Sequence, residues 1–164
     1  MEESIVTIFY IFIAALILKG ALYMVKQKNA VIIERLGKFN RVAKAGLQVK
    51  IPLIDSIAGN VNLRVRELPV EVETKTKDDV FVKIVVSVQF FVIDTVDGIK
   101  DSFYELNNPE QQIQSYVFDS IRSEVPLMEL DDVFAQKEKI AIAIKNELSD
   151  TMKQFGFDFI KALV

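Results

Sequence analysis

The chain has 164 residues, of which 51% are hydrophobic, and a net charge of −3. It contains neither cysteine nor histidine. These absences exclude disulfides, thiolate nucleophiles, Cys-type zinc sites and a Ser-His-Asp triad. The length allows one globular domain beside a terminal segment. The acidic balance lacks the excess of Lys and Arg with which nucleic-acid-binding proteins neutralise phosphates, so we expect no nucleic-acid partner.

The first element is an apolar segment, residues 5–25, in which 18 of 21 residues are hydrophobic. As a helix rising about 1.5 Å per residue it would reach about 31 Å, enough to cross the bilayer core if Lys19 snorkels to the interface. A buried core helix and a cleaved signal peptide are the alternatives, but Glu2 and Glu3 stand where a signal peptide needs basic residues. We therefore predict a membrane anchor in residues 1–28, with the membrane-facing residues Ile5, Ile8, Phe9, Ile11, Phe12, Ile13, Leu16, Ile17, Leu18, Leu22 and Val25.

The charges that flank this segment predict its orientation. Glu2 and Glu3 precede it, whereas Lys19, Lys26 and Lys28 lie at its C-terminal end or follow it. By the positive-inside rule the remaining domain faces the cytoplasm. A re-entrant segment would leave the domain on the same side.

A short apolar run in residues 30–36 and alternating apolar and polar residues in 47–51, 61–65, 70–74 and 80–93 then predict the strands of an antiparallel sheet. In the last of these, one face is apolar throughout and we expect it to be core. Glu71 and Glu73 share a strand face, which could indicate a metal or acid–base site. The nearby Lys and Arg residues favour a solvated face of mixed charge instead.

Three apolar residues, Leu53, Ile54 and Ile57, fall in a predicted loop. One interpretation is that they plug an end of the core. The other is that they are shallow membrane contacts beside the anchor, as an exposed apolar patch would permit.

The C-terminal half is predicted to be helical. Asn108, Pro109 and Glu110 form a helix start, and this helix ends before Pro126. A second helix runs from residue 131 or 132 to residue 155 and is capped by Gly156. A final strand begins at Phe157. The core-facing stripe of the second helix is expected to be Val133, Phe134, Ile140, Ala141, Ile144, Leu148, Met152 and Phe155.

Two residues of the second helix, Ala135 and Ile142, lie away from that stripe, at about 100° per residue. A single exposed isoleucine needs no explanation, but both residues are candidates for contact with a second subunit. Arg122 is a third candidate, and it could equally be the partner in an internal ion pair. The elements together predict an α+β domain.

The order of these motifs resembles the stomatin/prohibitin/flotillin/HflK-C superfamily, whose shared module is the SPFH or band 7 domain. The segments that carry the resemblance are 34–39 (ERLGKF), 46–47 with Pro52, 63–66 (LRVR), 73–78 (ETKTKD), 108–111 (NPEQ), 121–122 and 130–133 (LDDV). Residues 73–78, 117–125 and 130–136 look most like the hypersensitive-induced reaction branch. The likeness is colinear over residues 29–164.

The resemblance implies a non-enzymatic SPFH domain in residues 29–164, anchored to the membrane and without a cofactor. It implies self-association and the organisation of membrane lipids, microdomains or partners such as membrane proteases or channels. The branch that it resembles most begins with a lipid-modified Gly/Cys segment, whereas this chain has Glu2 and no cysteine. The long coiled coil of relatives is absent from these 164 residues, which suggests a truncated or minimal form.

Two other functions are open. The domain could be a monomeric anchored binding module that regulates a protease or channel. It could also be a membrane-bound hydrolase that uses polar groups of the helix beginning at Pro109, although no nucleophile elbow or phosphate loop accompanies them. Those groups are Ser115, Ser120, Ser123, Asp119 and Glu124.

Overall fold

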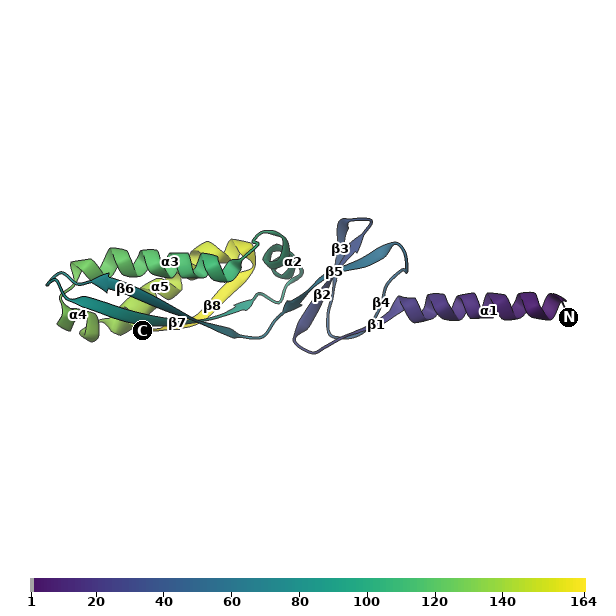
Figure 1. The fold of residues 1–164 in the computed structure, drawn as a ribbon, viewed down its shortest axis with the longest axis horizontal. Coiled ribbons are helices and arrows are strands. Elements are labelled where there is room, and N and C mark those ends of the chain that lie inside the picture. Colours follow the sequence, from purple (N-terminus) through teal and green to yellow (C-terminus); the bar gives the residue numbers. More distant parts are fainter. Residues whose placement is uncertain (1) are drawn as a thin grey trace. The chain divides into compact units, whose positions relative to one another are not determined.

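The computed structural model describes the backbone of residues 2–164 and the side chains from Val6 onward. The chain divides into two compact units, residues 1–62 (unit 1) and residues 63–164 (unit 2). Both combine helices with antiparallel strands (Figure 1), so the predicted α+β class is confirmed.

Unit 1 begins with helix α1 (Glu2–Ala21) and continues into two small sheets. Strand β1 (Leu22–Val25) pairs with β4 (Gly46–Val49). Strand β2 (Asn29–Arg35) lies between β3 (Lys38–Ala43) and β5 (Asp55–Asn62). The buried cluster of this unit consists of Val25, Val31, Ile33 and Ala43, with Tyr23 packed against it.

The structure corrects the C-terminal end of the predicted anchor. Leu22–Val25 is a strand, because the Ala21 carbonyl accepts the Lys50 amide at 2.8 Å and the following residues pair with β4. Val25 is buried in the core of unit 1 and faces no membrane. Leu22 belongs to the strand rather than to the helix.

The predicted strand at residues 61–65 is also wrong in its bounds. Strand β5 runs over Asp55–Asn62 instead, because these residues are in antiparallel register with β2. Ile57 therefore lies in a strand rather than a loop. Strand β3 was not predicted.

Unit 2 contains a three-stranded sheet of order β6-β7-β8, formed by β6 (Arg66–Lys75), β7 (Phe81–Val92) and β8 (Phe157–Leu163). Its helices are α2 (Val96–Tyr104), α3 (Pro109–Glu124), α4 (Leu130–Ala135) and α5 (Lys137–Met152), and α3 and α5 lie along the sheet (Figure 1). Short 3-10 turns, η1 (Val125–Leu127) and η2 (Lys153–Phe155), follow α3 and α5. The core of unit 2 consists of alternate residues of β7, from Ile84 to Val92, packed with buried apolar residues of α3, α5 and β8.

The predicted second helix is in fact two helices. Gln136 has non-helical dihedral angles (φ −106°, ψ 14°), and this break separates α4 from α5. The break shifts the helical phase, so that Phe134, predicted in the core stripe, is exposed. Phe155 lies beyond α5 in the 3-10 turn η2, off the helical stripe, and is only half-buried. The other predicted members of the stripe are buried. Helix α2, capped by the Thr95 hydroxyl, was not predicted.

Candidate functional surfaces

Two neighbouring loops of unit 1 present leucine side chains to solvent. Leu36, in the β2–β3 turn, and Leu53, in the loop before β5, both have left-handed backbone conformations (φ 49° and 72°). This conformation costs an L-residue with a side chain about 1–2 kcal/mol. Leu53 is fully exposed and Leu36 is 79% exposed. The Leu36 amide donates to the Ile54 carbonyl at 3.2 Å, which joins the two loops into one apolar tip, here called the leucine tip.

An ion pair between exposed Arg35 and buried Asp55 supports the leucine tip. Asp55 accepts hydrogen bonds from Arg35 Nε at 2.7 Å and from the Ile51 amide at 3.0 Å. Its own amide donates to the Ile51 carbonyl, so the loop is closed by both the backbone and the side chain. The Arg35 guanidinium and the Ile51 amide lower the pKa of Asp55 to about 2. Asp55 is therefore ionised at neutral pH and fixes the loop that carries Leu53.

The two-stranded β1–β4 ribbon has an exposed apolar face. Leu22 pairs with Val49 and Met24 with Leu47, so these four side chains share one face. All four are exposed, and Met24 is 78% exposed. The alternating pattern of residues 47–51 predicted a half-buried strand, but Gln48 faces inward and the apolar residues face outward. We call this surface the ribbon face.

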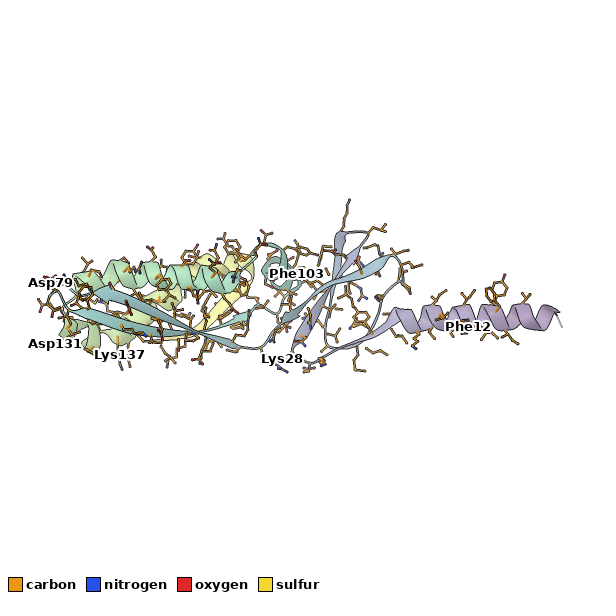
Figure 2. All side chains as sticks on the ribbon, in the orientation of Figure 1. Phe12, Lys28, Asp79, Phe103, Asp131 and Lys137 are labelled. Carbon is orange, nitrogen blue, oxygen red and sulfur yellow. The ribbon has the colours of Figure 1, made fainter. Side chains whose placement is uncertain are left out.

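Helix α1 carries exposed apolar side chains along its length, and Figure 2 shows side chains, including Phe12, projecting from both sides of its ribbon. The predicted anchor residues from Ile8 to Leu18 are exposed, while the side chain of Ile5 lies outside the described residues. Among the helices that the structure describes, none is long and apolar enough to span a bilayer. The C-terminal end of α1 approaches the leucine tip, because a Cβ at Gly20 would lie 3.8 Å from the Pro52 ring.

The three predicted shallow contacts are all exposed: Leu53, Ile54 (42%) and Ile57 (48%). They do not plug the core, so that interpretation is wrong. Leu36 was not predicted as a surface residue, although its position before Gly37 at the end of a predicted strand could have indicated an exposed turn.

A second apolar surface lies in unit 2, in a groove between α5 and the edge strand β8. Ile142, Ile160 and Leu163 contribute exposed side chains, and Lys137, Lys145 and Lys161 also line the groove. Of the predicted subunit contacts, only Ile142 lines it. Ala135 is exposed on α4, and Arg122 lies on α3 with its guanidinium 5.5 Å from the Phe118 ring.

The serine hydroxyls of α3 donate to acceptors within unit 2, and Ser120 also contacts Glu147 Oε2 of α5 at 2.5 Å. Ser115 and Ser120 donate to the carbonyls four residues earlier, and Ser123 donates to the carbonyl three residues earlier. Such local bonds are typical of serine in helices. Glu71 pairs with Lys83 at 2.6 Å, as a face of mixed charge requires. Across the described residues, no three acidic side chains gather as a metal site would need.

Comparison of the sequence with known proteins identifies the family to which this fold belongs. The chain belongs to the SPFH domain / Band 7 family, which matches residues 23–164. It is 41% identical to hypersensitive-induced response protein 4 of Arabidopsis thaliana over 134 residues, which cover 81% of this chain and 45% of that protein.

Two stomatin-like relatives are more distant. The chain is 30% identical to human mitochondrial stomatin-like protein 2, over 80% of this chain and 36% of the relative. It is 33% identical to stomatin-like protein stl-1 of Caenorhabditis elegans, over 70% of this chain and 34% of the relative. The chain thus spans less than half the length of the relatives that it matches. The predicted family resemblance is confirmed.

Proposed function

We propose that this protein is a membrane-associated, non-enzymatic SPFH scaffold whose unit 1 contacts the bilayer. The observation that carries the proposal is the exposed apolar surface of unit 1. It consists of α1, the leucine tip and the ribbon face, none of which is covered by the rest of the unit. A helix that is apolar all round is stable only when protein or lipid surrounds it.

The backbone strain of the leucine tip supports this role. A left-handed conformation is unfavourable for leucine, and glycine or asparagine would be expected if the turn alone mattered. Burying each leucine side chain in an apolar phase would return about 1.5–3 kcal/mol. Two such side chains on neighbouring loops therefore suit shallow insertion into a lipid surface.

Self-association is the second part of the proposal. The groove between α5 and β8 offers exposed Ile142 and Ile160 beside a sheet edge, and edge strands present unpaired backbone groups to a neighbour. An assembly through this surface would allow the scaffold to organise lipids or membrane proteins such as a protease or channel. The alternative is a monomeric binding module, for which the groove would hold a different protein.

The absence of cysteine provides a direct test of the membrane contact. A single cysteine introduced by L53C in the full chain can be labelled with an environment-sensitive fluorophore such as NBD. We expect its emission to shift to the blue and intensify when vesicles of phosphatidylcholine and phosphatidylserine are added, because the label enters lipid. The matched control, L127C in unit 2, should show no change, because Leu127 is also an exposed leucine (73%) and lies outside the groove.

Flotation of the unlabelled chain with the same vesicles should agree. An unchanged spectrum at position 53 would refute membrane contact by the leucine tip, and a chain that stays in the dense fraction would refute membrane association altogether. Mass photometry in detergent tests the second part. We expect a discrete oligomer that I160D reduces to monomers, whereas a wild-type monomer would favour the binding module.

A further inference from the structure

The two units differ in charge in a way that the whole-chain value conceals. Unit 1 contains eight basic and four acidic residues, a net charge of +4. Unit 2 contains 12 basic and 19 acidic residues, a net charge of −7. The overall value of −3 is the sum of a basic unit, which carries the exposed apolar surface, and an acidic unit.

The acidic residues of unit 1 do not offset its lysines at the apolar surface. Glu2 and Glu3 lie at the start of α1, the end away from the strands. Of the other two, Asp55 is buried and bonded to Arg35, and Glu34 is half-buried. Positive charge therefore predominates at the strand end of α1.

Three lysines lie next to the contacts that connect α1, the β2–β3 turn and the loop of residues 51–54. Lys19 precedes Gly20, which approaches Pro52, and Lys50 precedes the loop and donates its amide to Ala21. Lys38 follows the turn that carries Leu36. Lys19 and Lys38 are exposed and Lys50 is half-exposed. Each lies within two residues of a contact that joins α1 or the β2–β3 turn to the loop of residues 51–54.

These three lysines have no ion-pair partner among the described residues of the chain, in contrast to four of the nine lysines of unit 2. There, Lys75 pairs with Asp79 at 2.7 Å and Lys83 with Glu71 at 2.6 Å. The lysines around the leucine tip are thus available to charges outside the protein.

We infer that unit 1 binds selectively to an anionic lipid surface, with Lys19, Lys38 and Lys50 contacting headgroup phosphates or carboxylates while the leucine tip enters the apolar layer. The inference rests on the proposed membrane contact and adds the lipid class. Apolar tips surrounded by lysines suit the boundary between acyl chains and anionic headgroups, because lysine stems lie along apolar surface while their ammonium groups stay in the polar layer. The acidic balance of unit 2 gives it no such preference.

The test measures the partition of the full chain into phosphatidylcholine vesicles with and without phosphatidylserine. A lysine close to an anionic surface strengthens binding by about fivefold. We therefore expect K19Q/K38Q/K50Q to lose on the order of a hundredfold of the preference for anionic over neutral vesicles. The charge-matched control K77Q/K139Q/K153Q, at exposed lysines of unit 2 outside the groove, should keep the preference. K19R/K38R/K50R should retain it because the charge is unchanged. Raising the salt from about 0.1 M to about 1 M should reduce it in the wild type.

The outcomes separate this inference from the proposed function. If the wild-type chain partitions equally into neutral and anionic vesicles, the membrane contact stands and the lipid preference is refuted. If it partitions into neither, the proposed function itself fails. Equal loss in the unit 1 and unit 2 lysine variants would also overturn the inference, because it would show an effect of net charge rather than of this surface.

Discussion

Replacing Gly156 by alanine is expected to disrupt unit 2 far more than an ordinary glycine substitution. Gly156 ends the turn η2 with φ +80°, and its carbonyl accepts the Ile93 amide at 2.9 Å. A Cβ at this position would lie 2.0 Å from the Gly98 carbonyl oxygen, closer than real Cβ contacts come. The backbones of α2 and the start of β8 approach each other too closely for any side chain between them.

The magnitude follows from two separate contributions. The left-handed conformation alone costs alanine about 1–2 kcal/mol. Relieving the overlap requires a movement of about 1 Å or more, which adds overpacking strain and weakens the Ile93 hydrogen bond, for a total of about 3–5 kcal/mol. Gly37 is a matched control, because its φ is +79° and no heavy atom lies within 4 Å of the site of its Cβ.

Hydrogen exchange read by mass spectrometry can follow each unit of the full chain separately. We expect G156A to lower protection throughout β7, β8 and α2, and G37A to lower it modestly around the β2–β3 turn. Since Gly156 and Gly37 share the left-handed backbone conformation, the additional loss of protection in G156A measures the cost of the close approach to the Gly98 backbone. A loss of stability in G156A no greater than that in G37A would refute this account.

Three further outcomes are expected. Arg35 lowers the pKa of Asp55 from its ordinary value of 3.8 to about 2. The ion pair therefore stabilises unit 1 fully at pH values above 3.8, and this stabilisation is lost as the pH falls through about 2. The protection of unit 1 against hydrogen exchange, corrected for the intrinsic exchange rate at each pH, should therefore fall between about pH 4 and about pH 2 in the wild type, and a D55N variant with the same acid response would contradict this. Phe90 stacks on Phe159 at 5.9 Å, so F90A should destabilise unit 2 by about 3–5 kcal/mol in urea unfolding, and an unchanged midpoint would exclude a core role. Thr95 caps α2 through its hydroxyl, so T95A should cost about 1 kcal/mol in the same assay and T95S should recover most of it.

Local patterns predicted most elements of unit 2. The helix signals at Asn108 and Pro109, the alternation of β7 and the glycine cap at Gly156 all depend on short-range chemistry, and the structure confirms each of them. The break at Gln136 could not be predicted, because it replaces a helical pattern that is continuous in sequence. Its consequence is the exposure of Phe134.

In unit 1, local sequence patterns do not predict the type of every element or which face of a strand is buried. Leu22–Val25 continues an apolar run, and nothing local distinguishes a helix from a strand there. Pairing with Gly46–Val49 decides between them. The alternation of Leu47 and Val49 indicates a strand but not which of its faces is covered, since that depends on neighbouring strands. Here the core covers the side of Tyr23 and Gln48, and the apolar face remains exposed.

The sequence by itself determined the α+β class, the family resemblance and the apolar N-terminal segment, because composition, periodicity and motif order are properties of the linear chain. Only the tertiary structure decided which apolar side chains form a surface. Leu36 and Leu53 are 17 residues apart in sequence, and a hydrogen bond between their loops unites them. The division into units also showed that the small net charge conceals a basic unit and an acidic one. Both properties depend on which residues lie close together in space, and that is fixed by the pairing of distant strands.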